Sequence, residues 1–313
     1  MALLKAEAVK LSNNDLVRGV IEEILTRDSV FNLMPFVQTN GKAYVYNREA
    51  TISEGDFLDP NDAVNEGAAT FTEITTNLRI LAGDVDVDKF LIETMGDTND
   101  QLAIQIGLKA KALGRKAMRT LTIGAIASNG AVTGDAKSFD GMLTISNAGP
   151  AGQRINSTVA GNGGALTLAK LDELVDLLPN GADAIIMRPG TIRAYKALLR
   201  TTGSGTDAVM LQLPNFGKPV LTHNGLPILE NEWLPATEAL GTSGNVCCSV
   251  LAARFNEMDG YHGLFGGASA GIRVEEIGTV QTKDAYRVRV KWYLGAALKS
   301  TKSLAALKGI TDV

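Results

Sequence analysis

The chain has 313 residues, 45% of them hydrophobic, so it can bury a substantial core and form about two domains. Its 30 basic and 34 acidic residues give a formal net charge of -4, which excludes a global attraction to nucleic acid or acidic membranes. The first ten residues lack the apolar run of a signal peptide, and no stretch reaches the roughly 20 apolar residues of a membrane span. The two cysteines are neighbours, so we expect no disulfide framework and a reducing, cytosolic compartment.

The first predicted element is an amphipathic helix. After the good N-caps Asn13 and Asn14, apolar residues recur at helical spacing: Leu16, Val17, Val20, Ile21, Ile24 and Leu25. The segment Phe31 to Val37 is short and interrupted by Pro35, so we expect it to lie along another surface rather than in a core. Residues 1–38 are therefore predicted to form an N-terminal arm.

A long β-hairpin is predicted over residues 39–82. Strand-like segments at Lys42 to Asn47 and Phe71 to Leu81 flank an acidic, glycine-containing segment. Its tip carries five acidic residues and no basic one: Glu54, Asp56, Asp59, Asp62 and Glu66. An isolated two-stranded ribbon is only marginally stable in water. We therefore expect the hairpin to lie on a neighbouring subunit, with the five acidic residues as candidate contacts.

The next segment alternates carboxylates with valines and predicts a strand with its carboxylates on one face: Asp84, Asp86 and Asp88. This spacing resembles the start of a calcium-binding loop, but Lys89 replaces the turn glycine and Met95 replaces the bidentate glutamate. We interpret the carboxylates as a solvated or subunit-facing strand edge, where they also discourage wrong strand pairing.

A long helix is predicted from about Asn99 to Ile123. Its core face is formed by apolar residues three or four positions apart: Leu102, Ile106, Ala110, Leu113, Ala117 and Leu121. The opposite arc is basic and has no acidic member: Lys109, Lys111, Arg115, Lys116 and Arg119. This arc is either a solvated helix face or an inward face that contacts nucleic acid or an acidic protein without reading sequence.

Beyond Asn129 the chain is richer in glycine and predicts a second, mixed α/β domain. The expected elements are a strand at Asp140 to Ser146, a helix at Leu168 to Leu178, a strand at Ala184 to Met187 and a helix at Thr191 to Arg200. The predicted loops are Gln153 to Gly164 and Gly203 to Thr206. Two further strands are expected at Ile272 to Gly278 and Tyr286 to Leu298, followed by a short apolar run at Leu304 to Ile310.

Two patterns in this part of the chain resemble catalytic or ligand sites, and each lacks its required context. Ser269 lies in a G-x-S-x-G pattern, but a strand pattern follows it and no histidine lies downstream. Gly203, Gly205 and Ala208 loosely fit a dinucleotide fingerprint, yet they follow a helix instead of a strand. The histidines and cysteines match no zinc pattern: His223, Cys247, Cys248 and His262. We predict no catalytic residue, no cofactor and no metal.

Three stretches, together with the order of elements, carry a family resemblance. They are Asn40 to Asn47 at the start of the extended loop, Ala184 to Thr191, and Gly217 to Val220 with Asn224 to Ile228. Nearly the whole chain resembles the tailed-bacteriophage major capsid proteins of the Hong Kong 97 type. The resemblance implies an α+β fold with four parts: an N-terminal arm (1–38), an extended β-hairpin loop (39–82), a peripheral domain with the long spine helix (83–128 and 272–313) and an axial α/β domain (129–271).

The same resemblance implies a major capsid protein that is not an enzyme. Its copies would self-assemble into hexamers and pentamers of an icosahedral shell that encloses double-stranded DNA. The implied partners are other copies, a portal, a decoration protein, DNA contacted non-specifically, and a separate scaffold protein, because only about forty residues precede the hairpin. The implied location is the virion, after assembly in the host bacterial cytoplasm and without membrane contact. Covalent crosslinking is not expected, because members that crosslink use a lysine on the extended loop, whereas Lys42 lies at the loop base.

Two alternatives stay open at this point. An encapsulin, a cellular nanocompartment that encloses a cargo enzyme, would have the same fold. A small α/β hydrolase or ligand-binding protein is the remote alternative from a different class.

Overall fold

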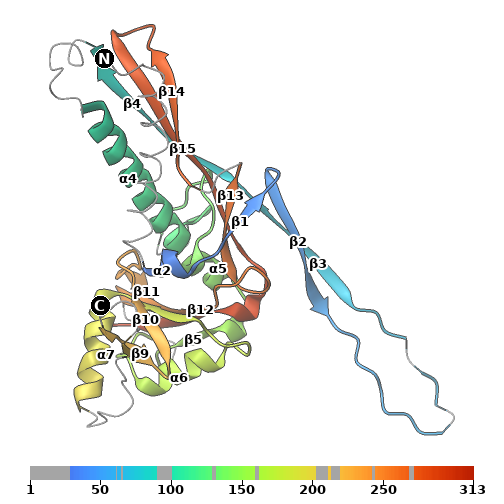
Figure 1. Cartoon of the computed structure of the whole chain (residues 1–313). Helices are drawn as coiled ribbons and strands as arrows, with labels where there is room; N and C mark the ends of the chain where they lie inside the picture. Colours follow the sequence, from blue (N-terminus) through green and yellow to red (C-terminus); the bar gives the residue numbers. More distant parts are fainter. Residues whose placement is uncertain are drawn as a thin grey trace.

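The computed structural model describes residues 29–60, 62–64, 66–89, 101–128, 132–158, 162–201, 211–212, 219–241, 244–267 and 271–313. Two sheets with their helices form the body, and a long hairpin projects from its side (Figure 1). The predicted helix around Leu16 to Leu25 lies outside the described residues. So do Gly203, Gly205, Ala208 and Ser269.

The first sheet has five strands and is built around β15 (Ala285–Leu298). Its other strands are β1 (Phe36–Thr39), β4 (Arg79–Asp88), β13 (Tyr261–Gly266) and β14 (Arg273–Thr279). Strands β4, β13 and β14 pair antiparallel with β15, and β1 pairs parallel with β13. The predicted strands near residues 84–88, 272–278 and 286–298 are thereby confirmed.

Alternation along β15 places apolar side chains on one face of this sheet and basic side chains on the other. Val288, Val290 and Trp292 are buried in the core, as the sequence pattern predicts. Helix α4 (Gln101–Ile123) covers this inner face (Figure 1). Its predicted core positions are confirmed where the side chains are described: Ile106, Ala110, Leu113, Ala117 and Leu121 are all buried.

The second sheet has seven strands in the order β5-β16-β12-β6-β10-β9, with β11 also paired to β12. Its strands are β5 (Arg154–Asn156), β6 (Ala184–Met187), β9 (Thr222–His223), β10 (Leu226–Glu230), β11 (Glu238–Ala239), β12 (Asn245–Ala253) and β16 (Leu304–Ile310). A separate short pair is formed by β7 (Leu211–Gln212) and β8 (Pro219–Val220). The predicted strand at residues 184–187 is the central β6.

Helices α6 (Leu168–Asp176) and α7 (Pro189–Thr201) confirm the two predicted helices. The Thr167 side chain caps α6 by accepting a hydrogen bond from the Lys170 N–H. Proline at the first position of α7 suits a helix start, where no N–H donor is required. Ile185 and Met187 of β6 pack in the cluster that these helices join, whereas the alternate residues of β6 face the core shared with the first sheet.

The predicted strand Asp140 to Ser146 is wrong, because this segment forms helix α5 (Met142–Ala148). Met142, Leu143 and Ser146 are buried, a spacing that fits one helix face. The helix packs against α4 and β16, so tertiary burial decides the conformation of a segment too short for its periodicity to be decisive. The predicted loop Gln153 to Gly164 is also partly wrong, because it contains β5, which pairs parallel with β16.

Residues 30–39 do not lie along another surface as predicted. After helix α2 (Ser29–Leu33), the chain enters the core of its own first sheet, and Phe31 and Met34 are buried. The Phe31 ring lies 4.9 Å from the ring of Phe36 and 6.2 Å from that of Trp292, measured between centroids. Aromatic packing of this kind outweighs the disruption from Pro35, so the arm prediction fails for this part of residues 1–38.

Two strands do not lie where the expected domain division places them. Strand β13, expected in the axial domain, belongs to the first sheet, and β16, expected in the peripheral domain, belongs to the second. The short helix η2 (Thr301–Ser303) carries the chain from β15 directly into β16, which pairs antiparallel with β12. The other predicted domain boundaries stay a prediction.

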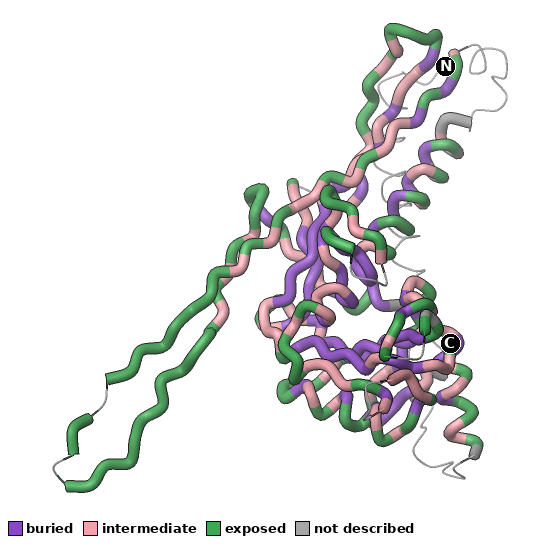
Figure 2. Tube along the Cα trace, turned by 180° about the vertical axis from the view of Figure 1, so that it is seen from behind, coloured by how far each residue is buried: buried purple, intermediate pink, exposed green. Residues whose placement is uncertain are grey.

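The predicted hairpin is present as β2 (Ala43–Thr51) and β3 (Thr70–Asn77). Its predicted second strand, Phe71 to Leu81, is too long, because residues 79–82 belong to β4 and pair with β15. The antiparallel register runs from the pair Ala43 and Asn77 at the base to the pair Thr51 and Thr70 at the outer end. Figure 2 shows the hairpin projecting away from the body, exposed along most of its length.

Candidate assembly surfaces

The outer part of the hairpin presents apolar and acidic side chains to solvent. Every described residue from 52 to 69 is exposed, including all five predicted contact residues: Glu54, Asp56, Asp59, Asp62 and Glu66. The Asp59 N–H donates to the Asp62 carboxylate at 2.9 Å, and the Asp62 N–H donates to the Asp59 carbonyl at 3.1 Å, so the tip contains a local turn. The structure therefore keeps these carboxylates together on one projecting segment.

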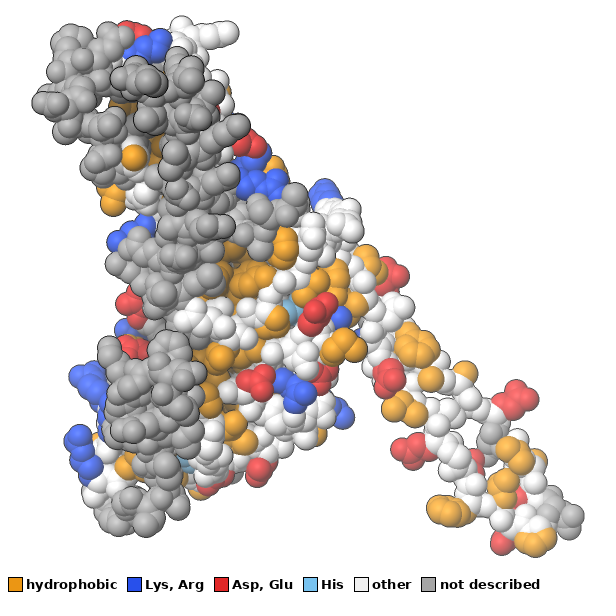
Figure 3. All heavy atoms as spheres, in the orientation of Figure 1, with side chains coloured by type: hydrophobic (Ala, Val, Ile, Leu, Met, Phe, Trp, Pro, Cys, Tyr) orange, Lys and Arg blue, Asp and Glu red, His pale blue; other side chains and the backbone are white. Residues whose placement is uncertain are grey.

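Sequence reasoning missed the apolar side chains that accompany these acids. Phe57 is as exposed as in an extended peptide, at 108%, and Ile52, Val64 and Phe71 are 70%, 79% and 66% exposed. Figure 3 shows hydrophobic and acidic side chains side by side along the hairpin. The signal was present in the dipeptide Phe57-Leu58 amid carboxylates. A large exposed apolar group on a projecting segment indicates a contact with another molecule.

The base of the hairpin is anchored to the body by three hydrogen bonds. The Tyr46 hydroxyl donates to the Leu298 carbonyl at 2.7 Å, and the Arg48 guanidinium donates to the same carbonyl at 2.5 Å. Arg48 also donates to the Lys299 carbonyl at 2.6 Å. Because these acceptors lie at the end of β15, the anchor fixes the direction in which the hairpin leaves the sheet.

His262 lies beneath this anchor. It is fully buried on β13, and its ring meets the Tyr44 ring edge-on at 5.8 Å between centroids. Its Nδ1 lies 3.3 Å from the Gly260 carbonyl, while Nε2 has no hydrogen-bond partner among the described residues. The Lys299 ammonium lies on the Tyr44 ring, 5.8 Å from its centroid. Burial lowers the pKa of His262, and Lys299 acts in the same direction, against the Gly260 carbonyl and Glu257.

We expect stability to fall as the pH drops below the ordinary His pKa of 6.5. Because the pKa of His262 is lowered in the folded state, this side chain binds its proton at a higher pH in the unfolded chain than in the folded one. As the pH falls between these two pKa values, protonation therefore favours the unfolded state. The measurement is the urea midpoint between pH 8 and pH 5 for the wild type and for His262→Gln, which cannot titrate. The variant should show a flatter pH profile, and an identical slope in both proteins contradicts the role of His262.

The carboxylates of β4 lie on one face of an edge strand, and Asp86 and Asp88 are exposed, as predicted. Asp84 accepts two hydrogen bonds from Arg289, at 2.7 and 2.9 Å, and Asp86 accepts two from Arg287, at 2.6 and 2.7 Å. These bonds lower the pKa of both aspartates. The pairing joins β4 to β15 across the outer face of the sheet, and contact of this face with another subunit stays a prediction. Within the described ranges no cluster of His, Cys, Asp or Glu could hold a metal.

The five basic residues of α4 do not form one uniform patch opposite the core. Arg115, Lys116 and Arg119 are exposed, whereas Lys109 and Lys111 are half-buried. The Lys109 side chain occupies the space that a Cβ at Gly83 of β4 would fill. On the other side, the Arg115 guanidinium lies 3.9 Å from the Glu232 carboxylate and 5.7 Å from the centroid of the Trp233 ring.

The cysteines and His223, which match no zinc pattern in the sequence, occupy structural positions. Cys247 and Cys248 are buried, and burial raises the pKa of Cys248 to about 11, so its thiol stays protonated at neutral pH. His223 is buried between Asp172 and Tyr195, with ring nitrogens 2.9 Å from the carboxylate and 3.1 Å from the hydroxyl. Strand β14 follows Gly271, so the segment after the G-x-S-x-G pattern lacks the helix that a nucleophile elbow requires.

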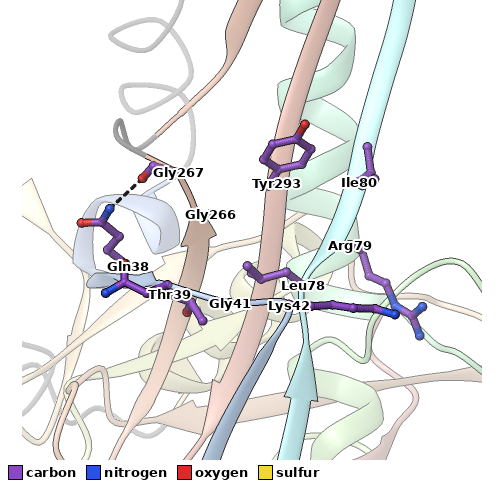
Figure 4. Close-up of a pocket in the computed structure, with 11 residues that line it drawn as sticks. Gln38, Thr39, Gly41, Lys42, Leu78, Arg79, Ile80, Gly266, Gly267 and Tyr293 are labelled. Carbon is purple, nitrogen blue, oxygen red and sulfur yellow. Dashed lines mark hydrogen bonds between the residues drawn. The ribbon is translucent and has the colours of Figure 1, made fainter.

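A pocket of about 550 Å³ lies where the hairpin joins the first sheet (Figure 4). We name it the root pocket, and it is lined by Gln38, Thr39, Asn40, Gly41, Lys42, Leu78, Arg79, Ile80, Gly266, Gly267 and Tyr293. Lys42 and Arg79 lie at one end of the pocket, and Gln38, which donates to the Gly267 carbonyl at 2.8 Å, lies at the other (Figure 4). Sequence reasoning missed this site, because its walls come from four separate stretches of the chain.

No family model matches the sequence, and no curated protein matches it. Solved structures do match. The chain is similar to the SrpI encapsulin from Synechococcus elongatus PCC 7942, with a TM-score of 0.68 and 20% identity, covering 99% of this chain and 96% of that one. It is similar to the capsid of the empty GTA particle, with a TM-score of 0.63 and 18% identity, covering 90% and 96%. A structure of Microbacterium phage Oxtober96 gives a TM-score of 0.59 and 13% identity over 90% of each chain.

Identities this low establish the fold alone. The three matched structures are an encapsulin complex, the capsid of a GTA particle and a structure of a Microbacterium phage, and the matches extend over most of both chains. The hairpin of β2 and β3 and the long helix α4 agree with the extended loop and the spine helix that the sequence predicts. The chain therefore has the α+β capsid fold of the Hong Kong 97 type.

Proposed function

We propose that this chain is the major capsid protein of a phage-like particle and forms the hexamers and pentamers of its shell. The observation that carries the proposal is the projecting hairpin, whose exposed aromatic and apolar side chains have no cover on their own molecule. A projecting surface that meets a different surface of the next copy generates closed rings when the rotation closes. The role is structural and not catalytic.

The capsid fold supports this proposal, since the similar structures cited above include the capsid of a GTA particle and a structure of a phage. The proposed partners are further copies of the chain, a scaffold protein, a portal and a decoration protein. The proposed location is the virion, after assembly in the host bacterial cytoplasm. No described helix is both long and apolar enough to cross a membrane.

Packaged double-stranded DNA is the proposed content of the shell. The basic face of α4 offers a surface for it, since Arg115, Lys116 and Arg119 are exposed. Lysine and arginine neutralise phosphates without reading bases, so such a contact would be non-specific and salt-dependent.

An encapsulin-type compartment is the second candidate. The specific observation in its favour is the SrpI encapsulin match, whose TM-score of 0.68 and coverage of 99% exceed the values for the GTA capsid. The two candidates share a shell and differ in its content, which is DNA in one and a protein cargo in the other.

The test is expression of the full chain, followed by sedimentation and negative-stain electron microscopy. We expect closed particles, and a chain that stays monomeric at all concentrations contradicts both candidates. Particles purified from the native phage or cell should hold nuclease-protected DNA, whereas a co-purifying enzyme without DNA favours the encapsulin.

A triple variant, Lys109→Glu, Lys116→Glu and Arg119→Glu, should form particles that hold less DNA if α4 faces inward. Normal filling contradicts that orientation.

A further inference from the structure

The root pocket combines an apolar floor with a basic rim. Leu78, Ile80 and Tyr293 form the floor, and Ile80 is 73% exposed on β4, an edge strand of the first sheet. Gly266 and Gly267 leave the backbone open on one wall, and a Cβ at Gly266 would lie 3.0 Å from the Leu78 side chain. The pocket is therefore concave and apolar, with room for one large side chain.

Four cations surround this floor. Lys42 and Arg79 line the pocket and form no ion pair within the part of the chain that the structure describes. Arg273 donates to the Gly266 carbonyl at 3.3 Å, and its guanidinium lies 5.8 Å from the centroid of the Tyr293 ring. The Lys291 ammonium lies 5.5 Å from the same centroid. Glu275, which pairs with Lys291, offsets only one of these four charges.

The hairpin tip has the complementary composition. Phe57 is a fully exposed aromatic side chain, and Asp56 and Asp59 flank it within two residues. Buried aromatic anchors surrounded by matched charges are typical of the residues that carry the binding energy of interfaces. Phe57 with its acidic neighbours thus fits a pocket that has an aromatic floor and a positive rim.

The tip cannot reach the pocket of its own molecule. Strand β3 separates Thr70 from the pocket by eight residues, about 26 Å at 3.3 Å per residue, and the tip continues beyond Thr70. Figure 1 shows the hairpin pointing away from its own base. Only another copy can bring a tip to this position.

The basic face of α4 is the competing receiver and fits less well. The cavity beside α4, lined in part by Lys116 and Thr120, is smaller than the root pocket, at about 200 Å³ against about 550 Å³. The cations of this face are also partly engaged, because Arg115 lies beside Glu232 and Trp233, and Lys109 lies over Gly83. The root pocket keeps Lys42 and Arg79 available at a cavity.

We propose that the root pocket receives Phe57, together with its acidic neighbours, from the hairpin of a second copy of this chain. This inference rests on the proposed function. The contact joins two different surfaces, the tip of one copy and the hairpin base of the next, so each subunit both gives and receives a tip. A ring of subunits then closes through identical contacts in which every hairpin base is covered.

The experiment is a disulfide test on the full chain. Leu58→Cys places a thiol beside Phe57, and Lys42→Cys places one at the rim of the root pocket. The native thiols do not compete, because Cys247 and Cys248 are fully buried. A disulfide requires Cα atoms within about 7 Å, so it reports the proposed contact directly. The matched control combines Leu58→Cys with Arg119→Cys on the exposed face of α4.

Assembled and oxidised particles of the Lys42 pair should give a ladder of covalent oligomers on a non-reducing denaturing gel, whereas the control pair stays monomeric. Particles that form but give no ladder with the Lys42 pair overturn this inference and leave the shell function intact. A ladder from the control pair alone assigns the tip to α4 and also overturns it. A wild-type chain that forms no particles removes the proposed function, and this contact with it.

A charge swap provides a second measurement that does not depend on cysteine substitution. Asp59→Lys and Arg79→Glu should each lower the assembled fraction by about tenfold or more, because like charges then meet in the contact. The double variant restores the opposite charges and should recover most of the assembly. A double variant as defective as the two single variants contradicts the pairing.

Discussion

Deletion of residues 52–69, with Thr51 joined to Thr70 through an Asn-Gly turn, should abolish shell assembly and leave the folded monomer intact. All described residues of this segment are exposed, so their removal takes no side chain out of the core. Thr51 and Thr70 face each other across the ribbon with their hydroxyl oxygens 2.6 Å apart, and a two-residue turn suits such a pair. The melting temperature of the monomer should change by about 2 °C or less, as for other surface changes.

The matched control replaces the same residues by a glycine-serine segment of equal length. It keeps the reach of the hairpin but removes Phe57 and the carboxylates, and we expect it to fail in assembly as well. Light scattering and electron microscopy report assembly, and thermal unfolding reports the monomer. Particles of wild-type size from the deletion variant contradict the central role of the hairpin. A much lower melting temperature would show instead that the tip stabilises its own molecule.

Trp292→Ala should lower the free energy of unfolding by about 3–5 kcal/mol, as large-to-small changes of buried aromatic residues do. Trp292 is 5% exposed on β15 and packs with the rings of Phe31 and Phe36. The cavity would open between the sheet and the segment that begins with α2, so the docking of β1 should weaken too. Urea unfolding followed by circular dichroism measures the loss.

Trp292→Phe is the informative control for this site. The indole Nε1 of Trp292 has no hydrogen-bond partner among the described residues, so phenylalanine forfeits no hydrogen bond and keeps most of the aromatic packing. We expect a loss of less than half of that caused by alanine. Equal losses in the two variants would indicate that an interaction of the indole nitrogen dominates, and not packing.

Long, regular patterns could be predicted from the sequence, because each repeats a periodic signal over many residues. The alternation along β15 and the core face of α4 are such cases. Helix α5 could not be predicted, since seven residues contain too few periods to separate a helix from a strand. The docking of β1 depends on aromatic partners more than 250 positions away, which no local pattern reveals.

Some of the candidate assembly surfaces could likewise be predicted from the sequence, and one could not. The carboxylates of the tip and the basic residues of α4 are clusters in sequence, so composition alone indicates them. The root pocket is not a cluster in the sequence, because residues near 40, 79, 266 and 293 meet only after the sheet has formed. Phe57 was overlooked because a single aromatic residue stands out only once its exposure is known. The fold of the Hong Kong 97 type is confirmed, and the hydrolase alternative loses its structural basis with it.

The placement of β13 in the first sheet and of β16 in the second has a mechanical consequence. Ala184 and Leu251 of the second sheet share one core with Val288 and Leu294 of the first, so neither half can swing without breaking packed contacts. The body of the subunit should therefore move as one rigid unit. Bending should occur in β2 and β3, where the hairpin leaves the body. If a shell of such subunits changes its diameter, we expect each subunit body to keep its shape while the hairpins that join the bodies pivot.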